Sequence, residues 1–104
     1  MKKAFILLVF GMAIIGVLAD QKPKDGFVPD AATATKIAVA IWEPIYGTNM
    51  LAFEKPYRAK LITNTVWRVQ GSLPPGYSEG VRGGVMTAWI AKDDGRILDV
   101  YHTR

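Results

Sequence analysis

The stretch after Asp30 repeats its hydrophobic residues at helical spacing. Asp30 can accept hydrogen bonds from the free backbone N–H groups of a first helical turn. Pro44 removes one backbone donor and Gly47 favours a helix end, so we expect a bend close to the end. The pattern predicts a helix over about residues 31–46. The apolar residues that share one of its faces are Ala34, Ile37, Ala38, Ile41 and Ile45.

The pattern then changes to an alternation of period two, which is typical of β-strands. Thr63-Asn64 separates two alternating runs, and Lys92-Asp93-Asp94-Gly95 separates two more; Asp-Gly supplies the positive φ angles that a tight hairpin turn requires. One helix followed by four antiparallel strands predicts an α+β fold, with an N-terminal helix packed on a curved four-stranded antiparallel sheet. The expected strands cover residues 56–63, 66–70, 85–91 and 97–102.

The first nineteen residues have the three parts of an export signal. Lys2 and Lys3 precede an apolar run, from Ala4 to Ala19, that contains no charged residue. An uncleaved membrane anchor is the alternative, but this run is shorter than the roughly 20 residues that span a bilayer core. We therefore expect a signal peptide at 1–19, a flexible leader at 20–26 and one domain at 27–104. The mature protein is expected to be periplasmic or secreted.

Composition excludes several classes of function. The chain has no cysteine, so disulfides, cysteine nucleophiles and cysteine-based metal sites are ruled out. Without Lys2 and Lys3, 13 basic residues become 11 against 9 acidic ones, a net charge of only +2. These basic residues are scattered, whereas a nucleic-acid surface needs a concentrated patch. We expect no nucleic-acid partner, and membrane contact only through an uncleaved signal segment.

Several short motifs, taken in order, resemble a known family. The chain is similar to the bacterial immunity proteins with a nuclear-transport-factor-2-like fold, which include the exported YbbC/YhhH group, over about residues 26–103. The motifs that carry the resemblance are Gly26-Phe27-Val28-Pro29-Asp30, Trp42-Glu43-Pro44-Ile45-Tyr46-Gly47, Lys55-Pro56-Tyr57, Val66-Trp67-Arg68-Val69, Gly71-Ser72-Leu73-Pro74, Gly83-Gly84-Val85 and Lys92-Asp93-Asp94-Gly95-Arg96-Ile97-Leu98.

The resemblance implies a cystatin-like or nuclear-transport-factor-2-like cone and a role in neutralising a cognate toxin. It supplies no catalytic residue and no cofactor. Together with the export signal, it predicts an exported immunity protein that binds a toxin domain, one that acts in the envelope. The alternative is a periplasmic module that binds a small ligand in a pocket between helix and sheet.

Alternation also predicts which residues face a partner. If Met86, Ala88 and Ile90 point toward the helix, Trp89 points away from it. On the last strand the same assumption turns Leu98 and Val100 inward and Ile97 and Tyr101 outward. A mixed aromatic and basic outer face suits protein binding, because Trp, Tyr and Arg dominate binding hot spots. The candidate partner-binding residues are Trp89, Tyr101, Arg58 and Lys60, with Tyr77 and Arg82 in the glycine-rich segment 71–84.

Three alternatives for this outer face stay open. The leader could cover it, a homodimer mate could cover it, or the inward assignment could be wrong by one residue. The pocket alternative would use Trp42, Glu43 and Tyr46, and an enzyme with Glu43 as base is a third hypothesis.

The remaining titratable residues point to structure. His102 is the only histidine and has no neighbouring ligand at metal-binding spacing, so we expect an ordinary hydrogen bond at a sheet end and no metal site. Asp93 and Asp94 fit turn chemistry.

Overall fold

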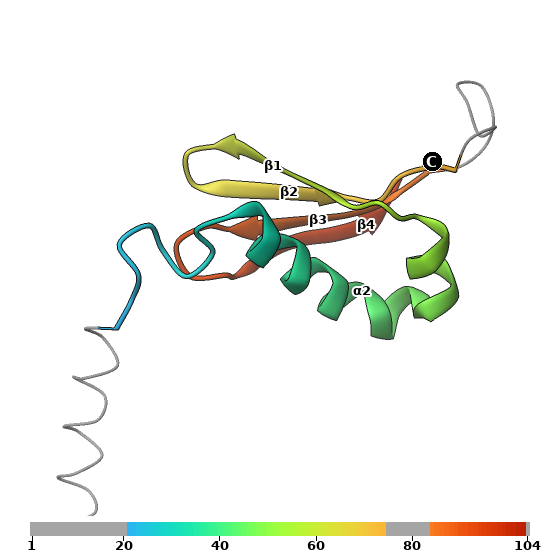
Figure 1. Ribbon diagram of the computed structural model, residues 1–104, viewed down its shortest axis with the longest axis horizontal. Coiled ribbons are helices and arrows are strands. Elements are labelled where there is room, and N and C mark those ends of the chain that lie inside the picture. The colour runs from blue at the N-terminus through green and yellow to red at the C-terminus, as the bar shows by residue number, and fades with distance from the viewer. Residues whose placement is uncertain (1–20, 75–83, 104) are drawn as a thin grey trace, which may run out of the picture.

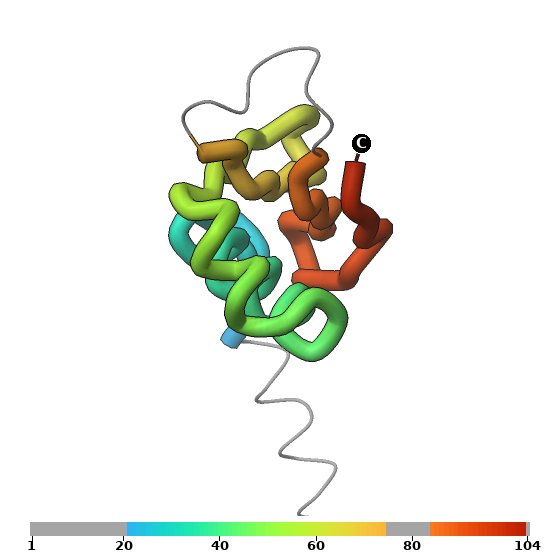
Figure 2. Tube along the Cα trace, turned by 90° about the vertical axis from the view of Figure 1, so that its right-hand side faces the viewer, coloured from blue at the N-terminus to red at the C-terminus, as the bar shows by residue number. Residues whose placement is uncertain are grey.

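One helix packs on one face of a four-stranded antiparallel sheet. The computed structural model describes residues 21–74 and 84–103, so the predicted signal peptide and the candidates Tyr77 and Arg82 lie outside the described residues. The sheet has the order β1-β2-β3-β4, and α2 contacts β1, β2 and β3. Figures 1 and 2 show the sheet bending around α2, which confirms the predicted fold class. The elements are α2 (Ala31–Phe53), β1 (Arg58–Thr63), β2 (Val66–Gln70), β3 (Met86–Ala91) and β4 (Ile97–His102).

Helix α2 begins as predicted but ends later. The Asp30 side chain accepts a hydrogen bond from the Thr33 N–H at 2.8 Å, which satisfies one of the free donors of the first turn. The first helical stretch ends at Gly47 as predicted, since Gly47 takes φ 85° and ψ 164°, and a second helical stretch then continues to Phe53. The break thus lies at the residue that tolerates a positive φ, rather than beside Pro44. The predicted end at residue 46 thus coincides with the break, whereas the second stretch up to Phe53 was not predicted.

The helix buries a narrower stripe than the sequence pattern suggests. Ala34, Ala38 and Trp42 lie four residues apart and are 0% exposed, and Leu51 continues the buried face after the break. Ile45, which we placed on that face, is 55% exposed. The small alanines let the helix approach the sheet closely, and Trp42 fills the space beyond them.

The inner face of the sheet completes the core. Met86, Ala88 and Ile90 on β3 are all 0% exposed, which confirms that they point toward the helix. The indole N–H of Trp67 donates to the Val28 carbonyl at 2.8 Å, and Val28 is itself 0% exposed. The segment before the helix is therefore part of the core.

A bulge corrects the predicted face of two residues on β4. Ile97 pairs with Ile90 and Asp99 pairs with Trp89, so the register shifts between these pairs. Ile97 therefore packs on the core, while Leu98 is 44% exposed. We predicted the reverse, because strict alternation does not include the extra residue that a bulge inserts. Val100, beyond the bulge, packs inward as predicted.

The segment before the helix is tied to the turn between β3 and β4. Phe27 N–H donates to the Asp93 carbonyl at 2.8 Å, and Val28 N–H donates to the Lys92 carbonyl at 3.0 Å. Gly26 has a φ of 89°, and a Cβ there would lie 2.6 Å from the Lys92 carbonyl oxygen. The close approach therefore requires glycine.

The helix cap gives a first testable prediction. Asp30→Ala should unfold at a lower urea concentration than the wild type, and Asp30→Asn should recover most of the loss because its amide oxygen accepts the same bond. Hydrogen bonds from Thr33, its side chain first and then its backbone, lower the pKa of Asp30 below its ordinary value of 3.8. A lowered pKa means that the carboxylate stabilises the fold at pH values above the pKa of Asp30 in the unfolded state. This stabilisation is lost as the pH falls through the pKa of Asp30 in the folded state. The loss of stability caused by Asp30→Ala should therefore become smaller at the most acidic pH. A loss of stability that stays constant with pH would contradict the role of Asp30 as helix cap.

Candidate functional site

The outer face of the sheet carries two rows of side chains that cross all four strands. Residues directly opposite each other on neighbouring strands share a face of the sheet. The register therefore places Trp89, Tyr101, Arg58 and Lys60 together on the side away from α2, as predicted. One row consists of Lys60, Arg68, Trp89 and Asp99, and the other of Arg58, Gln70, Thr87 and Tyr101.

Trp89 is held in place at the centre of this outer face. Its indole N–H donates to the Tyr101 hydroxyl at 2.9 Å. On the β2 side, the Arg68 guanidinium carbon lies 5.9 Å from the centre of the Trp89 ring, within the range of a cation–π contact. Trp89 and Tyr101 are both half-buried. Two large aromatic side chains are thus presented in a fixed arrangement with part of their surface open.

Arg68 is a member of this face that the sequence analysis did not select. It occupies the position between Lys60 and Trp89. The signal was present in the sequence, because Trp67 and Val69 point inward and Arg68 between them must point outward. Only the cross-strand register, however, shows that Arg68 lies beside Trp89.

A buried carboxylate lies at the other side of the sheet, where α2 ends. Glu54 is 1% exposed. One carboxylate oxygen accepts the Met86 N–H at 2.7 Å, and the other lies 2.8 Å from His102 Nε2. Its backbone carbonyl accepts the Ser72 N–H at 2.7 Å. A single residue thus joins the end of the helix to β3, to β4 and to the segment after β2.

His102 therefore does more than the ordinary hydrogen bond expected at a sheet end. It lies on the inner face because it pairs with Met86. Its Nδ1 lies 2.9 Å from the Thr103 carbonyl oxygen, and its ring packs edge-on against Tyr46 with centroids 5.8 Å apart. Both ring nitrogens contact oxygen atoms, so neither offers a free lone pair to a substrate. This arrangement supports a structural link rather than a general base.

Two tyrosines lie close to the Glu54 carboxylate. Burial first, and then the negative charge of Glu54, raises the pKa of both Tyr46 and Tyr57 above the ordinary phenol value of 10.0. The Tyr57 hydroxyl donates to the Leu51 carbonyl, and its ring meets Trp42 edge-on. These phenols stay protonated at neutral pH and serve as hydrogen-bonding and packing groups.

The three pocket candidates lie in different surroundings within residues 21–74 and 84–103. Trp42 is fully buried in the core and Glu43 is exposed on the helix surface, while Tyr46 packs on His102. The exposed Glu43 has none of the burial that would prepare a carboxylate for acid–base work. The indole N–H of Trp42 is buried without a hydrogen-bond partner in the described residues. The burial of Trp42 and the exposure of Glu43 thus place two of the three candidates in opposite environments.

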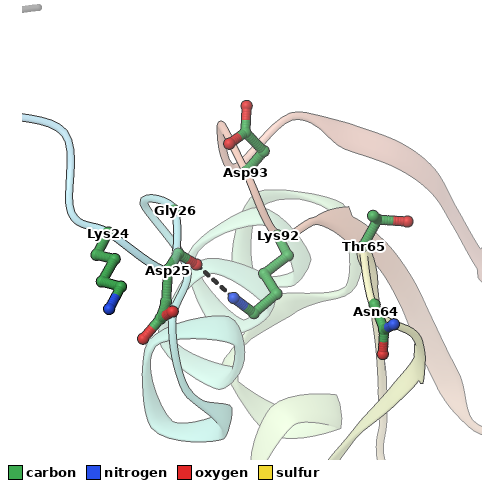
Figure 3. A pocket seen from close by; sticks show the side chains of 7 residues that line it. All are labelled: Lys24, Asp25, Gly26, Asn64, Thr65, Lys92 and Asp93. Carbon is green, nitrogen blue, oxygen red and sulfur yellow. Dashed lines mark hydrogen bonds between the residues drawn. The ribbon is translucent and has the colours of Figure 1, made fainter.

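A hollow does exist at the opposite end of the sheet, beside the two hairpin turns (Figure 3). Its volume is about 250 Å³, below the range of about 300–1,000 Å³ that is typical of ligand pockets. The Lys92 ammonium crosses it to the Asp25 carbonyl, and the lining combines two lysines with two aspartates. The hollow is thus open, polar and balanced in charge. Its lining residues are Lys24, Asp25, Gly26, Asn64, Thr65, Lys92 and Asp93.

Within residues 21–74 and 84–103, histidine, aspartate and glutamate side chains nowhere gather in a group of three that could hold a metal ion. No helix in this part of the chain is both long and apolar enough to cross a membrane.

The comparisons with known proteins agree with this geometry. Residues 33–104 match the family described as NTF2 fold immunity protein. The chain belongs to this family. It is also 36% identical, over 75 residues, to the uncharacterized protein YhhH of Escherichia coli (strain K12). That match covers 72% of this chain and 56% of YhhH, so the chain spans about half the length of this curated relative. No solved structure matches the chain.

The family match supports an immunity role in general terms. The outer face described above contains residue types that form hot spots in protein interfaces. The Glu54–His102 link is on the inner face of the same sheet. In this NTF2 fold immunity protein, candidate binding residues and structural residues thus occupy opposite faces.

The structural role of Glu54 can be tested by substitution. Glu54→Ala leaves the Met86 N–H and His102 without their acceptor, so the free energy of unfolding should fall by about 3 kcal/mol. Glu54→Gln keeps an acceptor oxygen and a donor for His102, and should cost about 1 kcal/mol. Glu43→Ala on the exposed side of the same helix is the control and should change stability by less than about 0.5 kcal/mol. Urea unfolding measures all three, and equal losses for Glu54→Ala and Glu43→Ala would refute the role.

Proposed function

We propose that this immunity protein is exported and neutralises a cognate toxin by binding it with the outer face of its sheet. The observation that carries the proposal is the open aromatic and basic face in a member of a toxin-immunity family. The inner face cannot serve this purpose, because the side chains from Met86, Ala88 and Ile90 are buried under α2.

Binding explains the features of the outer face better than solvent exposure alone. Large aromatic side chains contribute much of the energy of protein interfaces, and they bind best when their rotamers are already fixed. Trp89 meets this condition through its hydrogen bond to Tyr101 and its contact with Arg68. A toxin surface that covers Trp89 would displace water from the ring without having to order it first.

The site of action follows from the expected export signal. Residues 1–19 lie outside the described residues, and their pattern of Lys2, Lys3 and an uncharged apolar run supports export. An exported immunity protein meets its toxin in the envelope. The toxin is therefore proposed to attack an envelope target, or to be intercepted there before it enters the cytoplasm.

The proposal predicts binding, protection and a dependence of both on Trp89. The purified protein should bind the toxin encoded beside its gene, and Trp89→Ala should weaken the affinity at least about 30-fold, since hot-spot residues contribute 2 kcal/mol or more. Ile45→Ala is the matched control, because Ile45 is a large exposed apolar residue on α2 and not on the sheet. Calorimetry or biolayer interferometry measures the affinities.

A cellular experiment tests protection and export. Cells that carry the full chain should survive the toxin, and cells that carry Trp89→Ala should not. A variant without residues 2–19 should still bind the toxin in solution but should fail to protect. The proposal would be wrong if the wild type neither binds nor protects, and the envelope assignment alone would be wrong if the shortened variant protects fully.

A further inference from the structure

The charges on the outer face are distributed unevenly. Arg58 and Lys60 on β1 and Arg68 on β2 supply its basic side chains, while Asp99 on β4 supplies its acidic one. Within the two rows, three positive charges thus stand against one negative charge. The basic residues occupy adjacent positions at one side of the face, and Asp99 lies beyond Trp89 at the other side. The face is therefore polarised from β1 to β4.

The three cations have no carboxylate partner within the described part of the chain. The ion pairs there join Lys22 to Asp93, Arg96 to Asp94 and His102 to Glu54. None of these pairs involves the outer face. Adjacent like charges at Lys60 and Arg68 repel each other on neighbouring strands, which costs stability. If the sequence had been selected only for stability, we would expect an acidic residue at one of these two positions.

Other occupants fit this charge pattern poorly. A second copy of the chain would bring the same positive excess against itself. The leader is also unsuitable, because Asp20 and Asp25 are balanced by Lys22 and Lys24, so it has no acidic excess. Lys22 moreover pairs with Asp93 at the β3–β4 turn. An acidic partner, by contrast, supplies the carboxylates that the face lacks.

We infer that the toxin surface bound by this face is acidic, with carboxylates over Arg58, Lys60 and Arg68 and with Trp89 as the apolar anchor beside them. The inference rests on the proposed function and specifies the chemistry of its partner. Arg68 holds the central position: its guanidinium carbon lies 5.9 Å from the centre of the Trp89 ring, and a guanidinium can bind a carboxylate in a bidentate manner. Asp99 at the far side repels acidic side chains of the toxin and so sets the orientation in which the toxin docks.

The effect of these charges should appear mainly in the association rate. Exposed ion pairs contribute little to affinity one by one, but complementary charges steer the encounter of two proteins. Such steering weakens as salt screens the charges, with a Debye length of about 10 Å at 0.1 M salt. Loss of the basic side chains should therefore slow association at low salt and change little at high salt.

The experiment compares two variants of the full exported protein that change its net charge equally. Lys60→Glu reverses a charge on the outer face, and Lys36→Glu reverses one on the exposed side of α2. Stopped-flow or surface plasmon resonance with the toxin encoded beside the gene gives the association rates. Lys60→Glu should slow association about tenfold at 20 mM salt and less than about twofold at 500 mM, while Lys36→Glu should stay within about twofold of the wild type at both. Arg68→Gln should also speed dissociation.

The outcomes separate this inference from the proposed function. If the wild type binds and both reversals slow association equally, the outer face does not meet an acidic surface, although toxin binding stands. If the wild type forms a dimer that Trp89→Ala dissociates, a second copy covers the face and the inference is wrong. Binding to phosphatidylglycerol vesicles that Lys60→Glu abolishes, without an effect on the toxin, would also overturn it. Failure of the wild type to bind any neighbouring toxin would remove the proposed function and the inference together.

Discussion

The Glu54 carboxylate is the constraint on which the arrangement of helix and sheet depends. Burying a carboxylate costs several kcal/mol unless hydrogen bonds compensate for it. Glu54 receives that compensation from the Met86 N–H and from His102, which lie on two different strands. The helix can therefore end only where both strands are in place. A hydrophobic residue at this position could pack in several orientations, whereas the carboxylate needs its hydrogen-bond donors at defined positions around its two oxygens.

The same constraint explains the residue after β2. A Cβ at Gly71 would lie 2.5 Å from a Glu54 carboxylate oxygen and 2.8 Å from its Cβ, so a side chain does not fit there. Gly71 N–H donates to the Met86 carbonyl, and Ser72 N–H donates to the Glu54 carbonyl. The chain can thus pass close beside the buried acid and keep its backbone groups satisfied. This glycine is required because the chain passes so close to Glu54, whereas the sequence identified it only as part of the glycine-rich segment 71–84 and of one family motif.

The sequence predicted the parts of the fold that depend on local pattern. The order of the elements, the four strands and the two hairpin turns follow from hydrophobic periodicity and turn residues, which act over a few positions. Alternation also placed Trp89, Tyr101, Arg58 and Lys60 on one face correctly. It failed at Leu98, because the register shift that turns Ile97 inward depends on how β4 pairs with β3. The local signals also placed the helix break at Gly47, but they did not predict the second helical stretch that follows it.

The Glu54–His102 pair could not be predicted in the same way, since its members are 48 positions apart and neither belongs to a motif that names the other. The pair shows that two neighbouring residues of β4 have different roles. His102 points inward and holds the strand to the end of α2, while its neighbour Tyr101 points outward and holds Trp89. Because successive residues of a strand face opposite sides, a change at an exposed position of the outer rows can alter the proposed binding surface without touching the inner face. A sheet with one covered face can thus keep one fold while the exposed residues of its other face change.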